Sequence, residues 1–252
     1  MDARGASRRI GAAWKGTTRD DVMANILITG ANRGIGLELV KAYARGGDRV
    51  FAFCRSPGGA EALNALAAGS GGKVTVHAMD VGDGDSIAVG AQAVGDAPID
   101  ILINNAGIIG GHPQTLDKID FDAWIDAFKV MTIGPFRVVQ TFLPNLRKAA
   151  AAKVMTVTSQ LGASTWPYGA TYAYSSAKAG VNKVMQTLAI DLKGDRIAVS
   201  MIHPGWVKTD MGGAGADITP EESAAGIHSV IAGLSMADTG KFYKWNGDIH
   251  PW

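Results

Sequence analysis

The sequence predicts a single α/β domain of the doubly wound, Rossmann type, with a parallel sheet of about seven strands and helices on both faces. First, short apolar runs alternate with helical patterns from residue 24 to the end of the chain. Second, most of these runs are continuously apolar, which is typical of strands covered on both faces. Third, no linker-like stretch interrupts the alternation, so residues 24–252 are expected to fold as one domain.

Six apolar runs are predicted to form strands, and the stretches between and after them to form helices. The strands are expected at 25–29, 49–54, 73–79, 100–104, 153–159 and 196–202. The helices are expected at 34–46, 59–68, 84–95, 120–148, 172–193 and 220–235. A repeated strand–helix order with right-handed crossovers gives parallel strands, whose carboxyl ends face the ligand crevice.

The composition argues against several classes of function. The 252 residues carry a formal net charge of +1, which gives no reason to expect a nucleic acid or a membrane surface as partner. No apolar run reaches the roughly 18 residues that span a bilayer. The one cysteine, Cys54, cannot form an internal disulfide or a zinc site, and the histidines lack metal-ligand spacing. We therefore expect no metal and a reducing, cytoplasmic location.

The first 23 residues differ from the rest of the chain. They are basic and polar, lack sustained periodicity and contain no apolar core of a secretory signal. Asp2, Asp20 and Asp21 interrupt the basic character that a targeting peptide would need. We expect residues 1–23 to be a disordered tail, or a non-native N-terminal extension from a start codon assigned too early.

A glycine-rich loop follows the first predicted strand. Residues 29–36 read TGANRGIG and lead directly into a predicted helix, which is where a dinucleotide-binding fingerprint belongs. Gly30 can adopt the φ values of a tight turn, and Gly34 and Gly36 let the backbone approach a pyrophosphate. Free N–H groups at the helix N-terminus favour phosphate. The alternative interpretation is an ordinary glycine-rich turn.

One tyrosine of the stretch TWPYGATYAYSSAKAG has a lysine four residues later. Tyr174 and Lys178 therefore share a helix face, whereas Tyr168 and Tyr172 lack such a partner. An ammonium about 4 Å from a phenolate contributes about 4 kcal/mol at an effective dielectric of about 20. That is about three pKa units before desolvation opposes it. Tyr174 is thus the candidate acid/base.

A hydroxyl at the end of the fifth predicted strand could complete this group. Ser159 follows the run KVMTVT, at the sheet edge where ligands bind, and could hydrogen-bond a substrate oxygen. Thr158 is the alternative donor.

The glycine loop, the NNAG turn at 104–107 and the Tyr174–Lys178 spacing together resemble the short-chain dehydrogenase/reductase family. The segments HPGWVKTDMGG (203–213) and NGDIHPW (246–252) resemble its carbonyl-reductase-like branch, which includes C-factor-type proteins. The resemblance implies that Ser159, Tyr174 and Lys178 are catalytic and that Lys178 also holds the nicotinamide ribose. It implies a cofactor site that comprises Gly30, Asn32, Arg33, Gly34, Ile35, Gly36, Arg55, Asp80, Val81, Asn104, Ala106, Gly107, Tyr174, Lys178, Pro204, Gly205, Val207 and Thr209.

Two arginines indicate which nicotinamide cofactor binds. An NAD site usually places an acidic residue at the end of the second strand, but here Cys54 and Arg55 stand there. Arg33 and Arg55 could converge on a 2′-phosphate, so we expect NADP(H) rather than an oxidative, NAD-linked alcohol dehydrogenase. Alternatively, both are solvated surface charges. Asp80 resembles the family's adenine-contacting aspartate, while Asn104 could mainly brace the sheet.

The segments that follow the strands supply apolar side chains for a substrate pocket. These are Ile108, Trp166, Tyr168, Trp206 and Met211. They favour a small, mainly hydrophobic carbonyl or alcohol substrate, although several could instead cover the core or a subunit contact. By analogy with the family, the helices at 120–148 and 172–193 would pair two copies into a homodimer or homotetramer.

One expected side chain is missing. Members of the family usually have an asparagine three residues before a glycine of the long helix, where it holds a water of a proton relay. Met131 occupies that position before Gly134, and a thioether donates no hydrogen bond. Two hypotheses follow. The protein is a carbonyl reductase with another route for the proton, or it is a cofactor-binding regulatory or signalling protein with weak catalysis.

Overall fold

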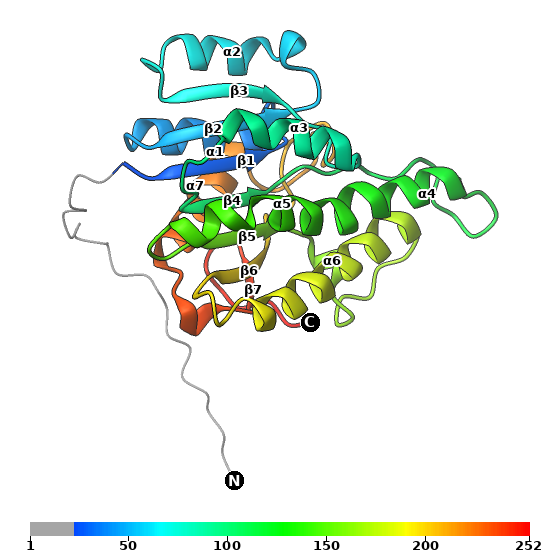
Figure 1. Ribbon diagram of the computed structural model, residues 1–252. Coiled ribbons are helices and arrows are strands. Elements are labelled where there is room, and N and C mark those ends of the chain that lie inside the picture. Colours follow the sequence, from blue (N-terminus) through cyan, green and yellow to red (C-terminus); the bar gives the residue numbers. More distant parts are fainter. Residues whose placement is uncertain (1–22) are drawn as a thin grey trace.

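A seven-stranded parallel sheet runs through the centre of the computed structural model, which describes residues 23–252 (Figure 1). The strands are β1 (Asn25–Thr29), β2 (Arg49–Cys54), β3 (Val74–Ala78), β4 (Ile101–Asn104), β5 (Lys153–Val157), β6 (Ala198–His203) and β7 (Phe242–Lys244). Their order is β3-β2-β1-β4-β5-β6-β7. The predicted fold class is confirmed. The prediction for residues 1–23 lies outside the described residues, apart from Met23.

Helices cover both faces of the sheet because the strands are apolar on both sides. The helices are α1 (Gly34–Arg45), α2 (Glu61–Ala68), α3 (Gly84–Val94), α4 (Phe121–Phe128), α5 (Gly134–Lys148), α6 (Tyr172–Asp191) and α7 (Pro220–Gly233). On one face α3, α5 and α6 bury a core that includes Phe53 and Phe142. On the other face α1, α2 and α7 bury a core that includes Tyr43 and Ile227.

The predicted helix at 120–148 is wrong as one continuous helix. A π-helical turn, Lys129–Ile133, separates α4 from α5. Pro135 explains the break, because a proline has no N–H to donate to the carbonyl four residues earlier, here that of Met131. As a result α4 projects beyond the sheet in Figure 1, where it packs beside α6.

The other differences from the predicted elements are local. The predicted helix at 59–68 begins at Glu61, after a 3-10 turn at Pro57–Gly59. Of the seven strands, β7 has no counterpart among the six predicted ranges, because it is only three residues long and has no apolar run of its own. It pairs with β6 through Met201, Ile202 and His203.

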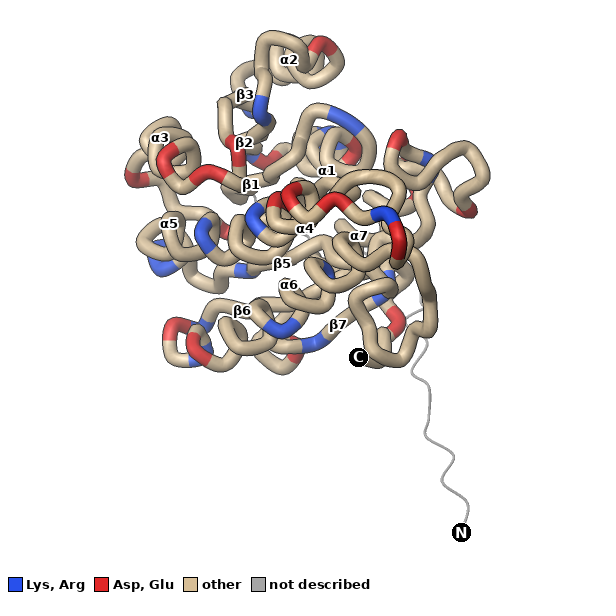
Figure 2. The backbone as a smooth tube through the Cα atoms, turned by 90° about the vertical axis from the view of Figure 1, so that its right-hand side faces the viewer, with Lys and Arg blue, Asp and Glu red and all other residues tan. Residues whose placement is uncertain are grey.

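Charged residues are interspersed along the described backbone (Figure 2). Within residues 23–252, no helix has the length and the apolar composition that crossing a membrane requires.

Candidate active site

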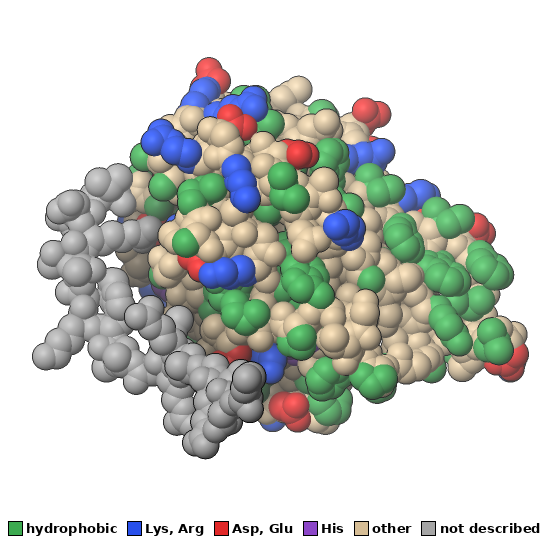
Figure 3. Space-filling view, turned by 90° about the horizontal axis from the view of Figure 1, so that it is seen from below, with side chains coloured by type: hydrophobic (Ala, Val, Ile, Leu, Met, Phe, Trp, Pro, Cys, Tyr) green, Lys and Arg blue, Asp and Glu red, His purple; other side chains and the backbone are tan. Residues whose placement is uncertain are grey.

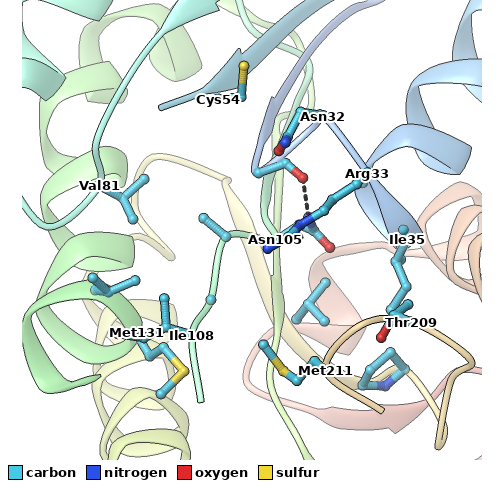
Figure 4. Close-up of a pocket in the computed structure, with 18 of the residues that line it drawn as sticks. Asn32, Arg33, Ile35, Cys54, Val81, Asn105, Ile108, Met131, Thr209 and Met211 are labelled. Atoms are coloured by element: carbon cyan, nitrogen blue, oxygen red, sulfur yellow. Dashed lines mark hydrogen bonds between the residues drawn. The ribbon is translucent and has the colours of Figure 1, made fainter. Parts of the chain in front are cut away.

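A cleft of about 420 Å³ opens at the carboxyl edge of the sheet, where the chain order reverses between β1 and β4. Its walls include residues that directly follow β1, β2, β3, β4, β5 and β6. Most of the predicted site residues line it: Gly30, Asn32, Arg33, Gly34, Ile35, Gly36, Arg55, Asp80, Val81, Ala106, Gly107, Ile108, Tyr174, Lys178, Pro204, Thr209 and Met211. In Figure 4, Cys54 lies toward one end of the cleft, and Met131 and Ile108 lie together toward the other.

The glycine loop has a shape that side chains would prevent. Gly30 has φ +65°, in the left-handed region that favours glycine. A Cβ on Gly36 would collide with the carbonyl oxygen of Gly30 and come within 2.6 Å of the Asn105 amide nitrogen. Helix α1 then begins at Gly34 with no side-chain cap and no acidic residue in its first turn. Its first N–H groups therefore remain available to an anion.

The arginine end of the cleft is open to solvent. Arg33 Nη1 donates to Asp210 Oδ2 at 2.6 Å, and both side chains are exposed. Arg55 is also exposed, whereas its neighbour Cys54 is buried. Asp80 shapes its own turn, since its Oδ1 accepts from the Gly82 N–H at 2.8 Å. These residues place two guanidinium groups, Arg33 and Arg55, along one cleft.

The opposite end brings together the three predicted catalytic side chains, of which Tyr174 and Lys178 line the cleft. Ser159 does not line it, whereas its alternative, Thr158, does. Tyr174 and Lys178 lie on the first turns of α6, and the Lys178 Nζ is 5.8 Å from the centroid of the Tyr174 ring. Lys178 is buried and donates from Nζ to the Val157 carbonyl at 2.9 Å. Ser159 caps the 3-10 turn after β5 and hydrogen-bonds the Tyr174 side chain. The alternative donor, Thr158, donates to the Lys178 carbonyl at 3.4 Å.

Burial dominates the ionisation of this group. It raises the pKa of Tyr174 above its ordinary value, and the hydrogen bond with Ser159 opposes that rise. It lowers the pKa of Lys178 to about 8. The expectation that Lys178 mainly lowers the pKa of Tyr174 is therefore not met in this structure. The effect of desolvation on the Tyr174 pKa is larger than the opposing effect of the Lys178 ammonium. That ammonium is itself destabilised by burial, and it already donates to the Val157 carbonyl.

Met131 lies beside this group. It is buried within the π-helical turn, and a Cβ on Gly107 would come within 3.6 Å of its sulfur and 3.8 Å of the Lys178 Nζ. The neighbouring Thr132 hydroxyl donates to the Ala177 carbonyl at 2.8 Å, so it is already engaged. The position expected to be an asparagine thus presents a thioether on the same side of Gly107 as Lys178.

The structure places several predicted residues outside the cleft wall. Asn104 is buried and donates toward Pro135 O and Thr156 Oγ1, both at 3.4 Å, so it braces the sheet. Val207 is buried and pairs with Ile218, while Gly205 packs against Ile218 and Trp245. Three predicted pocket residues, Trp166, Tyr168 and Trp206, are exposed. They lie on loops, which periodicity does not orient.

Some lining residues were missed. These are Met79, Asn105, Val130, Val157, Lys208, Asp210 and Pro220. Asn105 is the most informative, because its amide nitrogen donates to Thr29 O at 3.1 Å and Gly30 O at 3.0 Å and so fixes the glycine loop. It immediately follows β4, so side-chain alternation at the strand end would have favoured Asn105 over Asn104. Among the described residues, no group of three or more His, Cys, Asp or Glu could hold a metal ion.

Comparisons with known proteins agree with this geometry. The family model described as short chain dehydrogenase matches residues 24–217, well over half of the chain. The C-signal of Myxococcus xanthus is 36% identical over 156 residues, 62% of this chain and 93% of that protein. An NADPH-bound carbonyl reductase from chicken fatty liver superposes with a TM-score of 0.85 at 34% identity, over 91% of this chain and 99% of that one.

A second solved structure gives the same picture. The carbonyl reductase Sniffer of D. melanogaster has a TM-score of 0.84 at 30% identity, and the match covers 92% of this chain and all of that one. The family model extends over the glycine loop, the sheet edge and the first turns of the Tyr174–Lys178 helix. The chain therefore belongs to the short-chain dehydrogenase family, whose members are oxidoreductases.

Proposed function

We propose that this protein is an NADP(H)-dependent reductase of small, mainly hydrophobic carbonyl compounds, with Tyr174 as its acid/base. One observation carries the proposal. A half-buried tyrosine, hydrogen-bonded to Ser159 and one helical turn before Lys178, lies in a cleft that begins with a glycine loop shaped for a dinucleotide. The reverse reaction, oxidation of a secondary alcohol, uses the same groups.

The raised pKa of Tyr174 favours the reducing direction. A tyrosine that stays protonated at neutral pH can donate its hydroxyl proton to a carbonyl oxygen. The bound nicotinamide cofactor would supply the hydride, with its two electrons, to the carbonyl carbon. Ser159 can hydrogen-bond the same oxygen as charge develops there. Protonated Lys178 can stabilise the phenolate that Tyr174 becomes, and the product is the alcohol.

The preference for NADP(H) is supported by charge. Arg33 and Arg55 both line the cleft, and the end of β2 presents Cys54 rather than a carboxylate. Guanidinium groups bind phosphate with two parallel hydrogen bonds, which a 2′-phosphate can accept. The similar reductase from chicken fatty liver is described as NADPH-bound. Asn105 replaces Asn104 in this proposed cofactor site, because Asn105 is the residue that lines the cleft.

The substrate class follows from the wall near Tyr174. Ile108 and Met211 line the cleft, and Met131 adds a third apolar side chain. An apolar wall with a few convergent polar groups suits a small hydrophobic carbonyl. Trp166, Tyr168 and Trp206 are exposed outside the wall, so we assign them no contact with a small substrate.

The decisive experiment measures consumption of NADPH with a panel of aromatic and aliphatic aldehydes and ketones. We expect turnover with hydrophobic members of the panel and a loss of at least about 1,000-fold in kcat for Tyr174→Phe. Circular dichroism and NADPH affinity should stay unchanged in this variant, because only the hydroxyl is removed. Full-speed hydride transfer by folded Tyr174→Phe would refute the mechanism.

Met131 favours a second candidate function, a cofactor-binding regulatory or signalling protein with weak catalysis. A thioether beside Gly107 and Lys178 cannot order a water as an amide can. A relative that is 36% identical carries the name C-signal. Tight NADPH binding with no turnover across the panel would favour this candidate. In the reductase interpretation, Met131→Asn raises kcat without a change in Tm of more than a few degrees, and a lower kcat would show a different proton route.

An exposed apolar surface supports the proposal that two copies pair. Figure 3 shows hydrophobic side chains gathered at the end of the molecule where α4 projects. Leu116, Phe121, Ile125 and Tyr172 are 87%, 67%, 54% and 43% exposed. A second copy placed against α4 and α6 would remove these side chains from water. Sedimentation of Phe121→Glu should then show a smaller species than the unmodified protein, and an unchanged species would exclude this surface.

A further inference from the structure

Helix α6, which carries Tyr174, begins without a side-chain cap of its own. The residue at its N-cap, Thr171, has φ −140° and ψ 41°, and its hydroxyl lies 2.6 Å from the Ser175 hydroxyl instead of bonding the helix backbone. Ala170, just before it, has φ +58°, in the left-handed region. The first N–H groups of a helix have no partner within the helix, so those of α6 need an acceptor from elsewhere.

Gln114 supplies that acceptor from the loop between β4 and α4. Its Oε1 accepts from the N–H of Ala173 at 2.9 Å and from the N–H of Tyr174 at 3.2 Å. The side chain is buried, although it is a loop residue far from α6 in the sequence. An N-cap side chain makes the same kind of bond to the second and third helical residues. Here a residue from another part of the chain makes both.

The other end of the same amide holds the loop. Gln114 Nε2 donates to Ile109 O at 2.8 Å and to Gly111 O at 3.1 Å, and lies 3.5 Å from Gly110 O. The loop is tightly packed there, since a Cβ on Gly110 would come within 3.0 Å of the Ala173 Cβ. Ile108, at the start of this loop, lines the cleft. The Gln114 amide thus connects the loop that follows Ile108 to the first turn of α6.

We propose that Gln114 is a positioning residue of the active site, which sets the Tyr174 hydroxyl against Ser159 and holds the loop at 109–111, next to the cleft-lining Ile108. This inference rests on the proposed function of Tyr174. Tyr174 is the third residue of α6, and its own backbone N–H is one of the two groups that Gln114 holds. A shift of the first turn would move the hydroxyl, and misplacement by about 1 Å can cost about 100-fold in rate.

Two variants separate the roles of the Gln114 acceptor, Oε1, and the Gln114 donor, Nε2. Gln114→Met keeps the length of the side chain but removes the acceptor and the donor. We expect kcat with NADPH to fall by about 10- to 100-fold while the Kd of NADPH stays within about threefold. Gln114→Glu keeps an acceptor for Ala173 and Tyr174 and, when its carboxyl is ionised, loses the donor to the loop. It should hold kcat within about fivefold of the unmodified protein and raise the KM of the carbonyl substrate.

The matched control is a second buried amide that bridges a loop away from the cleft. Asn145 Nδ2 donates to Gly95 O at 2.8 Å and to Ala97 O at 2.7 Å. Asn145→Leu should lower Tm about as much as Gln114→Met, yet leave kcat per folded molecule within about twofold. If Asn145→Leu reduced kcat as strongly, the loss would be a general effect of lost stability and the proposal would be overturned.

The remaining outcomes also decide between the two proposals. If Gln114→Met keeps kcat within about threefold while Tyr174→Phe is inactive, Gln114 has no positioning role and the proposed function stands. If Tyr174→Phe keeps full activity, the proposed function itself fails. Should Gln114→Met not fold, Gln114→Glu decides alone. A folded glutamate variant with kcat reduced by more than about tenfold overturns the proposal, whereas a retained kcat with a raised KM supports it.

Discussion

The two ends of the cleft are built in opposite ways. At the end that we propose as reactive, Lys178 is buried and Tyr174 is half-buried, and desolvation shifts both pKa values toward the uncharged forms. At the phosphate end, Arg33 and Asp210 form an ion pair whose side chains are 68% and 79% exposed. The reactive end is held by buried hydrogen bonds, such as that from Lys178 to Val157, and the phosphate end by charges in water.

This difference shows what each task requires. Proton transfer depends on pKa values, which shift strongly only where water is excluded. Recognition of a phosphate needs a cation that is always charged, and an exposed guanidinium meets this requirement at little cost in desolvation. We therefore expect substitutions at the reactive end to have large effects on rate, and substitutions at the phosphate end to have smaller effects on affinity.

After Tyr174→Phe, the largest effect is expected from Lys178→Met. This change removes the only cation that the structure shows one helical turn from Tyr174, and kcat should fall by about 100- to 1,000-fold. The control is Lys183→Met on the exposed side of the same helix, where the Lys183 Nζ donates to Gln186 Oε1 at 3.0 Å. Steady-state kinetics of both variants make the test. Equal kcat values for the two variants would show that the buried lysine has no larger role in the reaction than the exposed one.

The next effect concerns stability. Because the pKa of Lys178 is about 8 in the folded protein and 10.5 in an unfolded chain, the folded state holds fewer protons between these pH values. The free energy of unfolding should therefore rise with pH across this window, by up to about 3 kcal/mol from Lys178. Urea titrations at pH 7.5 and 10.5 measure it, and Lys178→Met should lack this part of the rise. An identical rise in both proteins would show that Lys178 is not desolvated.

A smaller effect is expected at the end of β2. Arg55→Asp should lower the kcat/KM ratio of NADPH to NADH by about 10- to 100-fold, since a carboxylate repels a 2′-phosphate and can accept from a 2′-hydroxyl. Arg45→Asp, at the end of α1 and outside the cleft lining, is the control for net charge. Titrations with both cofactors give the ratio. An unchanged ratio in Arg55→Asp would assign the preference to other residues.

The smallest effect is expected from Asp210→Asn. Exposed ion pairs contribute about 0–1 kcal/mol, so thermal unfolding without cofactor should change by no more than a few degrees. NADPH should bind slightly more tightly, because Arg33 no longer has a carboxylate that competes with phosphate. Scanning calorimetry measures the unfolding temperature, and titration calorimetry measures the affinity for NADPH. A loss of NADPH affinity of more than tenfold would mean that cofactor binding depends on the Arg33–Asp210 ion pair, contrary to this prediction.

The sequence predicted the site best where chemistry is tied to regular structure. The Tyr174–Lys178 spacing on α6 and the glycines after β1 were assigned because helical and strand periodicity fix where such side chains point. The fold class followed from the same periodicity. The position of Ser159 after β5 was found in the same way, by its place at a strand end.

Features that depend on tertiary contacts were not predictable. The desolvation of Tyr174 raises its pKa, against the direction expected from Lys178 alone. The break between α4 and α5 is different, because Pro135 signals it in the sequence itself. Trp166 and Trp206 lie on loops whose orientation only packing determines. Gln114 gave no pattern at all, because its partners on α6 are about 60 residues away.

The single cysteine of the chain has a practical consequence. Cys54 lines the cleft yet is only 3% exposed, and burial raises the pKa of its thiol, so it should react slowly with alkylating reagents. A molecule that fills the phosphate end would shield it further. The rate of alkylation at this one sulfur could therefore report ligand occupancy in the unaltered protein, without an introduced label.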